Sequence, residues 1–509
     1  MTHTRIPGRT LPSWPQATEL PETQALEENL TVDICVVGAG IAGLTTAYML
    51  ALEGRSVAVL DKGPVGGGNT GRTTAQASNA LDDRYSELLR VHGEEKAQLA
   101  AQSHTAAIDM IEKIVREENI DCAFERIDGY LFTPLGDTSD VLEEELEATR
   151  RVGLTNVQKV GRAPLSNFDT GPSLLFPNQG QFDPLRYLSG LKEAIGRLGG
   201  KIYTDTPVET IKDSKPVEVH THSGRTVTAD AVVVATNSPI NDRVTLHTKQ
   251  APYTSYVVAA EVAAGSVTKA LYWDTLDPYH YVRVQSQPDR DTDLLLVGGE
   301  DHKTGQADDA EARYAKLEAW GRERFPSMQG ITHRWSGQVY ESLDGLAFIG
   351  LNPGDNAIYV VTGDSGMGMT HGTIAGMLLR DRILGRNNPW TDVYNPERKP
   401  VKAAGEFASE MLNVAGQFTE LATSGSGKSE DISRDSGNVI GFGPAKRAVY
   451  RDHSGALHTC SAICPHLGCV VSWNSGEKTW DCPCHGSRFD AYGKVLNGPA
   501  KADLKPVND

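Results

Sequence analysis

Four of the seven cysteines and two histidines lie within one short stretch, from Cys464 to Asp490. The pattern is Cys464-x-His466, then fifteen residues, then Cys482-x-x-His485. Zinc ribbons use the same ligand types, but they usually pair cysteine with cysteine and histidine with histidine. One cysteine and one histidine from each segment suits a two-iron cluster, in which two cysteines hold one iron and two histidines hold the other. The spacing therefore predicts a metal site and leaves zinc and iron–sulfur open.

A second chemical pattern lies near the N-terminus, in "VDICVVGAGIAGLTTAYMLALEGRSVAVLDKG". Gly38, Gly40 and Gly43 spell G-x-G-x-x-G between an apolar strand and an amphipathic helix, where backbone and helix N-terminus can approach a pyrophosphate. Asp61 follows the next apolar strand and is placed to accept a hydrogen bond from a ribose 2′-hydroxyl. The pattern predicts a bound dinucleotide, and the acidic residue disfavours NADP.

The remaining sequence predicts the elements that position these residues. We expect helices at 82–118 and 184–199, and antiparallel strands over roughly 252–300. A buried strand is expected at 229–238, and a strand, a glycine-rich turn and a helix over 345–384. The Gly/Ser-rich stretch 416–433 predicts a boundary, and the residues after it have β character. The chain is thus expected to form a large α/β body and a small β domain.

Composition narrows the class of partner. The net charge is −17 for 49 basic and 66 acidic residues, which disfavours non-specific binding to nucleic acid or anionic lipid. The first residues have no apolar leader core, and no apolar run is long enough to span a bilayer. We therefore expect a cytoplasmic protein without a membrane span. Cys35, Cys122 and Cys460 are expected to pack in the core.

The N-terminal motifs, with "NTGRTTAQAS" (69–78), "ADAVVVATNS" (229–238) and the glycine-rich turn at 363–370, resemble the D-amino-acid oxidase family of FAD-dependent oxidoreductases. The resemblance covers roughly residues 30–390. It implies an α/β FAD-binding Rossmann-like domain with an antiparallel-sheet substrate domain. It also implies FAD contacts from Gly38, Gly40, Ile41, Ala42, Gly43, Asp61, Lys62, Thr70, Gly71, Arg72, Thr73, Thr74, Ala75, Val208, Ala235, Thr236, Gly363, Gly366, Gly368, Met369 and Thr370.

The cysteine–histidine stretch closely resembles the Rieske [2Fe–2S] domain, a small all-β fold. This implies Cys464, His466, Cys482 and His485 as cluster ligands and a disulfide between Cys469 and Cys484. Ser487 falls where such domains hydrogen-bond a bridging sulfide, and Phe489 stands where respiratory members have tyrosine. Losing that donor disfavours the reduced cluster, so we expect a potential below the respiratory type, near the middle of the range of about −150 to +300 mV.

Together these resemblances imply four segments. They are an N-terminal extension (1–30), a FAD-dependent oxidoreductase domain (31–415) whose substrate part is mainly 245–340, a linker (416–432) and the Rieske domain (433–509).

The residues that would bind the substrate are less well defined by the sequence than those that would bind the cofactors. Members that act on amino acids often have W-x-G-x-R, whose arginine binds the substrate carboxylate. Here the stretch is Trp335-Ser336-Gly337-Gln338-Val339, which favours an amine over a simple α-amino acid. Arg283 and Arg334 remain as anionic anchors, with surface ion pairs the plainer interpretation. Strand alternation over 277–284 puts Tyr279, Tyr281 and Arg283 on one face and His280 on the other. The substrate-cavity candidates are Tyr281, His280, Trp335 and Gln338.

The two cofactors suggest one function. A flavin accepts two electrons from an organic substrate, and a Rieske cluster carries one at a time. The sequence therefore predicts oxidation of a C–N bond in a small amine or amino-acid-like substrate, with electrons leaving through the cluster to an unidentified one-electron acceptor. The alternative is a reductase that feeds a separate oxygenase or cytochrome. A redox sensor is a third hypothesis, although no DNA-binding motif is present.

Overall fold

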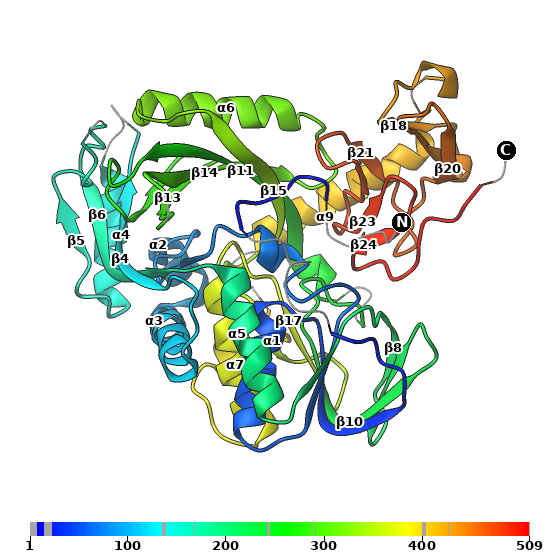
Figure 1. Cartoon of the computed structure of the whole chain (residues 1–509), viewed down its shortest axis with the longest axis horizontal. Helices are drawn as coiled ribbons and strands as arrows, with labels where there is room; N and C mark the ends of the chain where they lie inside the picture. Colours follow the sequence, from blue (N-terminus) through cyan, green and yellow to red (C-terminus); the bar gives the residue numbers. More distant parts are fainter. Residues whose placement is uncertain are drawn as a thin grey trace.

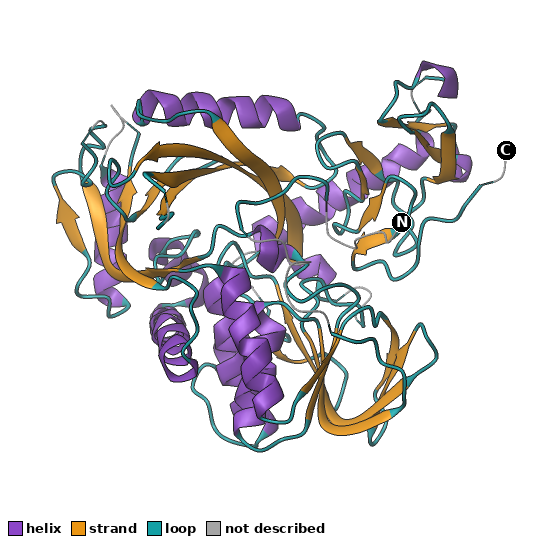
Figure 2. Cartoon of the chain, in the orientation of Figure 1, coloured by secondary structure: helices purple, strands orange, loops and turns teal. Residues whose placement is uncertain are grey.

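The computed structural model describes residues 8–14, 23–134, 139–166, 168–241, 245–288, 290–399, 404–425 and 427–507. Of the expected N-terminal extension, residues 1–7 and 15–22 lie outside this set. Two large sheets form the body of the molecule, and two small sheets near the C-terminus form a separate β unit beside it (Figures 1 and 2). None of the helices in the described residues combines the length and apolar character needed to cross a membrane.

The first large sheet carries the glycine turn. Its central strands are short apolar runs that pair in parallel, as expected for strands covered on both faces. Across the sheet the strands are β16 (Phe348–Leu351), β17 (Ile358–Thr362), β10 (Thr226–Val234), β1 (Leu30–Val37), β2 (Val57–Leu60) and β7 (Lys201–Tyr203), with β9 (Val217–Thr221) and β8 (Val208–Lys212) paired beside β10.

The second large sheet lies above the first in the view of Figure 1. Its strands between 250 and 303 pair in antiparallel fashion, as predicted for roughly 252–300, and α6 covers one face. In order they are β15 (Ile331–Ser342), β11 (Gln250–Ala263), β14 (Thr292–Lys303), β13 (His280–Gln285), β12 (Leu271–Asp274), β4 (Glu125–Phe132), β6 (Ser173–Gln181) and β3 (Gln76–Ala77), with β5 (Gln158–Val160) paired to β6.

The predicted helix at 82–118 is two helices, because Gly93 between them has φ +80°. The predicted helix at 184–199 begins as expected, since the Asp183 carboxylate accepts hydrogen bonds from the backbone amides of Leu185 and Arg186. The α-helices are α1 (Ile41–Leu52), α2 (Tyr85–His92), α3 (Glu94–Glu118), α4 (Asp140–Arg151), α5 (Pro184–Arg197), α6 (Ala310–Arg324), α7 (Gly368–Ile383), α8 (Thr391–Tyr394) and α9 (Ala404–Phe418).

The small β unit has a core of its own, which includes Trp473, Trp480 and Phe489. It contains a three-stranded and a four-stranded sheet. The strands are β18 (Ser436–Ile440), β19 (Arg447–Arg451), β20 (Leu457–Ser461), β21 (Ser472–Asn474), β22 (Thr479–Asp481), β23 (Arg488–Asp490) and β24 (Val495–Asn497).

The segment expected as a linker, 416–432, is held against the small β unit. Its first residues complete α9, and the side chains of Phe418 and Leu421 pack against the core of the β unit. Arg451 donates hydrogen bonds to the backbone carbonyls of Ser429 and Ile432. Residue 426 lies outside the described residues. Along its described length this segment therefore packs on the small β unit and is not a flexible linker.

Candidate functional site

The glycine turn between β1 and α1 leaves no room for side chains. A Cβ on Gly38, whose φ is +112°, would overlap the carbonyl oxygen of Ala235, and one on Gly43 would overlap the carbonyl oxygen of Gly38. Gly40 caps α1 without a side-chain hydrogen bond. The turn therefore presents bare backbone and a helix N-terminus, the arrangement that attracts a phosphate.

Asp61 follows β2 and faces this turn. Its carboxylate accepts hydrogen bonds from the backbone amides of Ala39 (2.6 Å) and Gly63 (2.8 Å). Burial raises the pKa of Asp61, and these two amides partly oppose that rise. The carboxylate is thus fixed at the end of the strand, where it suits a ribose hydroxyl.

One cavity of about 1470 Å³ runs from the glycine turn to the second sheet. It exceeds the roughly 300–1,000 Å³ of a typical small-molecule site, so a dinucleotide and a substrate fit together. The predicted FAD contacts that line it are Gly38, Gly40, Ile41, Ala42, Asp61, Lys62, Thr70, Arg72, Thr73, Thr74, Val208, Ala235, Thr236, Gly366, Gly368 and Met369.

Five predicted FAD contacts lie behind the cavity wall: Gly43, Gly71, Ala75, Gly363 and Thr370. Gly71 has no space for a side chain, because a Cβ would overlap the carbonyl oxygen of Gly66. The Thr370 hydroxyl is 2.8 Å from Nδ1 of His104, inside the core. These residues shape the wall instead of facing the cavity.

The predicted alternation along β13 separates two of the substrate-cavity candidates. Tyr281 lines the cavity, and its hydroxyl lies 3.2 Å from the hydroxyl of Ser255. His280 points to the opposite face, where its Nδ1 lies 2.9 Å from the Asp274 carboxylate and its ring stacks on Trp320. His280 does not line the cavity.

The side chains of Trp335 and Gln338 on β15 contact the backbone of other segments of the protein. Trp335 is fully buried, and its indole N–H donates to the backbone carbonyl of Arg72 at 2.9 Å. Gln338 borders the cavity, but its side-chain amide donates to the carbonyl of Gly486 at 2.8 Å, in the small β unit.

Neither candidate arginine anchor, Arg283 or Arg334, lines the cavity, so neither is placed to bind an anionic substrate there. Arg283 is buried and donates to the backbone carbonyls of Thr74 and Ala75. Arg334 is half exposed and pairs with Glu311. Val339, at the motif's arginine position, lines the cavity.

The predicted cluster ligands converge in the small β unit. Cys464 and His466 follow β20, and Cys482 and His485 follow β22. The two histidine rings lie 5.0 Å apart between centroids. The adjacent Cys482 thiol lowers the pKa of Cys464, and the backbone amide of His466 acts in the same direction.

These residues fit a [2Fe–2S] cluster. Burial lowers the pKa of His485 to about 3, with His247 and His466 contributing, so the ring is neutral as a metal ligand requires. Its Nδ1 atom is buried and has no hydrogen-bond partner among the described residues. Ser487 lies close enough to Cys464 to lower its pKa, and Phe489 is fully buried.

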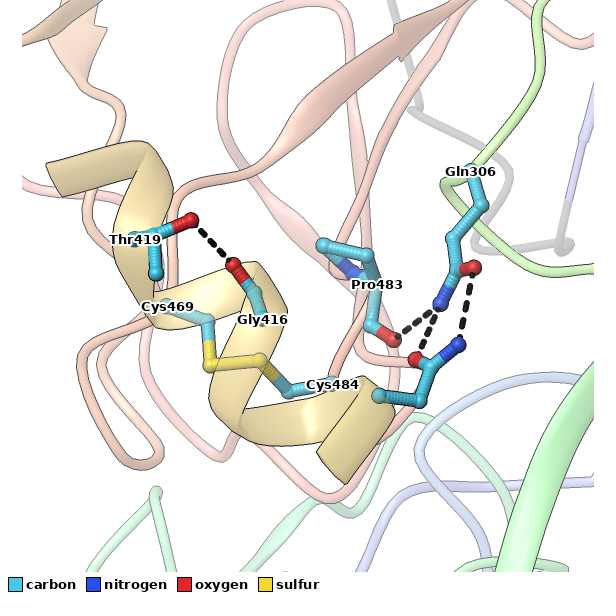
Figure 3. The surroundings of a disulfide bond; sticks show 7 residues. Gln306, Gly416, Thr419, Cys469, Pro483 and Cys484 are labelled. Carbon is cyan, nitrogen blue, oxygen red and sulfur yellow. Dashed lines mark hydrogen bonds between the residues drawn. A yellow bond between two sulfur atoms is a disulfide. The ribbon is translucent and has the colours of Figure 1, made fainter. Parts of the chain in front are cut away.

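Cys469 and Cys484 form the disulfide that the resemblance implies. It joins the two ligand segments and lies against α9 (Figure 3). In the same view the side-chain amide of Gln306, from the body, contacts the carbonyl of Pro483. That amide also donates to Asn413 of α9 at 2.8 Å. The ligand segments are thus supported by both the helix and the body.

A buried ion pair joins the small β unit to the cavity wall. The Arg72 guanidinium lies 2.7 Å from the Glu477 carboxylate, and both side chains are at most 4% exposed. Arg72 also donates to the carbonyl of Thr10, and Glu477 accepts from the hydroxyl of Ser336. Burial favours a raised pKa for Glu477, but Arg72 and Arg488 hold it below its usual range. The Arg72 guanidinium is therefore engaged with the β unit.

His247 brings the body against the cluster site. It lies in the short 3₁₀ helix His247–Lys249 before β11 and is almost fully buried. Its ring centroid is 5.0 Å from that of His466 and 5.8 Å from that of His485, both edge-on. The Tyr340 hydroxyl donates to the His485 carbonyl at 3.1 Å. The histidine side of the cluster site thus faces the body.

Sequence reasoning missed Glu477, His247 and the acidic residues at the substrate end of the cavity. Glu477 and His247 carry no local signal, because their partners are more than 200 residues away. Asp301 carried a signal in the sequence, because it lies in β14 just after an apolar run, and an acidic side chain at such a position is a candidate for a functional role.

Comparison with known proteins agrees with this geometry. The FAD dependent oxidoreductase (DAO) model matches residues 33–382. The chain belongs to this family. A Rieske [2Fe-2S] domain model matches residues 426–508, so the protein is an FAD-dependent oxidoreductase with a [2Fe–2S] domain.

Three relatives place the chain further. Protein YhfW of Bacillus subtilis (strain 168), whose name describes a Rieske 2Fe-2S iron-sulfur protein, is 31% identical over 97% of each chain. Gamma-glutamylputrescine oxidoreductase of Escherichia coli (strain K12) is 29% identical over 71% of this chain and 85% of that protein. The glycine oxidase of Geobacillus kaustophilus superposes with a TM-score of 0.62 at 19% identity, covering 73% of this chain and 100% of that one. This last likeness shows the fold.

The glycine turn predicts a sharp effect on FAD binding. Gly38→Ala places a side chain at positive φ against the Ala235 carbonyl, which costs about 1–3 kcal/mol. We expect FAD affinity to fall about tenfold or more, measured by titrating the apoprotein with FAD. Gly196→Ala, in open space on α5, is the control and should bind FAD normally. Equal affinities for the two variants would contradict the assignment.

The buried ion pair predicts a large loss of stability. Glu477→Ala leaves the Arg72 charge buried without its partner, which costs about 3–5 kcal/mol. The exposed Arg334–Glu311 pair provides the control, and Glu311→Ala should cost less than about 1 kcal/mol. Urea unfolding of both variants, followed by tryptophan fluorescence, measures the difference. Similar losses in the free energy of unfolding for the two variants would contradict a stabilising role of the buried pair.

Proposed function

We propose that this oxidoreductase is a dehydrogenase that oxidises a C–N bond of an amine. Its electrons then leave one at a time through the Rieske cluster to a separate one-electron acceptor. The observation that carries the proposal is the buried junction between the cavity wall and the cluster site, formed by the Arg72–Glu477 pair and by His247 against His466 and His485. A flavoenzyme that returned its electrons directly to oxygen would not need this junction.

β15 connects the two sites over a few residues. Gly337, Gln338, Val339, Tyr340 and Glu341 line the cavity. Ser336, Gln338 and Tyr340 also donate hydrogen bonds to the small β unit. This stretch of β15 therefore borders the cavity and holds the small β unit.

The reaction needs little from protein acids and bases. When bound, FAD accepts the hydride of the oxidation, which carries both electrons, and the cluster carries single electrons. The amine R–CH2–NH2 becomes the imine R–CH=NH, releasing two electrons and two protons, and water hydrolyses the imine to an aldehyde and ammonia. Two molecules of a one-electron acceptor balance each turnover. The task of the cavity is to hold the neutral amine close to the cofactor.

The lining of the cavity supports an amine. Val339 removes the arginine that would bind an α-carboxylate, and Arg283 and Arg334 are engaged elsewhere. The E. coli relative is named for an amine derivative, which agrees with this choice.

Anaerobic mixing tests the proposal. The full-length holoprotein, with FAD and acid-labile sulfide verified, is mixed with primary and secondary amines, amino acids and NADH. We expect an amine to bleach the flavin absorbance and a Rieske EPR signal to follow. Reduction by NADH and by no amine would overturn the proposal and indicate a reductase that feeds a separate oxygenase or cytochrome.

The contact between His247 and the cluster histidines predicts that the rate of flavin reduction and the rate of cluster reduction can be changed separately. In His247→Ala the cavity is unaltered, because His247 does not line it. We expect the flavin to bleach while the EPR signal appears several-fold more slowly, because a buried ring that packs on the cluster histidines is lost. His247→Phe keeps a ring and should restore part of the rate. His453→Ala, at an exposed position, should change neither rate, and unchanged cluster reduction in His247→Ala would rule out this route.

A further inference from the structure

One part of the cavity wall is acidic. Asp82 precedes α2, Asp301 lies on β14 and Glu341 lies on β15, so three separate segments bring carboxyl groups to one place. We call these three residues the acidic end. Asp83 and Asp364 line the cavity beside it.

The acidic end has few of the partners that carboxylates in a cavity wall normally have. Asp82 accepts a hydrogen bond from the Tyr279 hydroxyl at 3.2 Å, and Asp301 interacts with Ser255. One carboxyl oxygen of Asp301 and one of Asp364 are buried and make no hydrogen bond in the described structure. The charge of Arg313 acts on Asp301, and that of Arg84 acts on Asp83. Buried carboxyl oxygens without partners cost stability unless a ligand satisfies them.

The carboxyl groups also raise one another's pKa values. Burial is the largest cause and raises the pKa of Asp82 to about 7, with Asp83 and Asp301 adding to the rise. Burial likewise raises the pKa of Asp301 to about 7 and that of Glu341 well above its usual range. A cation placed among these groups would reverse this effect, because an opposite charge favours the ionised form.

Two aromatic rings border the same place. Tyr279 and Tyr281 line the cavity with ring centroids 5.7 Å apart and planes tilted by 38°. The hydroxyl of Tyr281 lies 3.2 Å from that of Ser255, and the charges of Asp301 and Asp82 act on it, so this ring borders the acidic residues. The faces of tyrosine rings attract ammonium groups, and a carboxylate would gain nothing from them.

We propose that the acidic end binds the distal ammonium group of a diamine or polyamine, while a second amino group of the same molecule is oxidised at the flavin. This assignment rests on the proposed amine oxidation and names its substrate class. The product of a diamine is then an amino-aldehyde, with the electron balance given above unchanged. A substrate whose distal group is a carboxylate is repelled by Asp82, Asp301 and Glu341.

The test compares three substrates of equal chain length: 1,4-diaminobutane, butylamine and 4-aminobutyrate. Anaerobic flavin bleaching of the full-length holoprotein gives the rate constant divided by the dissociation constant for each. We expect the diamine to exceed the monoamine by about 100-fold, the value of one desolvated charge pair, and 4-aminobutyrate to be the poorest.

Two variants locate the effect. In Asp301→Asn and Glu341→Gln we expect the ratio of diamine to monoamine to fall at least tenfold, with FAD and iron contents verified. Asp121→Asn, whose side chain is 93% exposed, is the matched control and should keep the ratio. Monoamine and diamine reacting equally well in the unaltered protein would overturn the acidic-end assignment and leave the proposed function standing. No amine reacting at all would overturn both.

Discussion

The arrangement of the two sites depends on one buried ion pair, Arg72 with Glu477. Two charges removed from water are costly, and a well-packed apolar pair of the same size is often as stable or more so. The pair therefore contributes less to net stability than to specificity, because a docking that separated the two side chains while they stayed buried would leave their charges unpaired. Ser336 and Thr10 complete the hydrogen bonds that such a pair requires. The chain thus favours one position of its cluster domain over all others.

This constraint explains why β15 can serve two purposes. With the β unit fixed, Gln338 and Tyr340 meet the backbone of the second ligand segment, Gly486 and His485. Gln338 and Tyr340 also line the cavity, together with Val339 between them. The family motif beginning at Trp335 therefore has a second role here. Its last position is Val339 in place of an arginine, and Gln338 contacts another domain. The same few residues thus border the cavity and hold the cluster domain.

Local patterns predicted what local chemistry determines. The glycine turn, Asp61 and the cysteine–histidine spacing each need particular residue types at fixed separations, so the sequence displays them directly. Strand alternation assigned Tyr281 and His280 to opposite faces. It did not tell which face borders the cavity, because that depends on how two sheets pack. Arg72 shows the limit most clearly: its place in the sequence suggested the flavin, while its guanidinium pairs with a residue 405 positions away. Pairings of that kind, His247 with the cluster histidines included, follow from tertiary structure alone.

The same contacts bear on whether the cluster domain moves during turnover. A swing would separate Arg72 from Glu477, expose the face that His247 covers and break the hydrogen bonds of Gln338 and Tyr340. The segment after α9 offers little slack for this, since Arg451 holds its carbonyls and Phe418 packs into the β unit. A further ion pair between Lys303 and Glu410 ties α9 to the body. Breaking several buried polar contacts at once costs free energy. The structure therefore favours a cluster domain that stays fixed on the body.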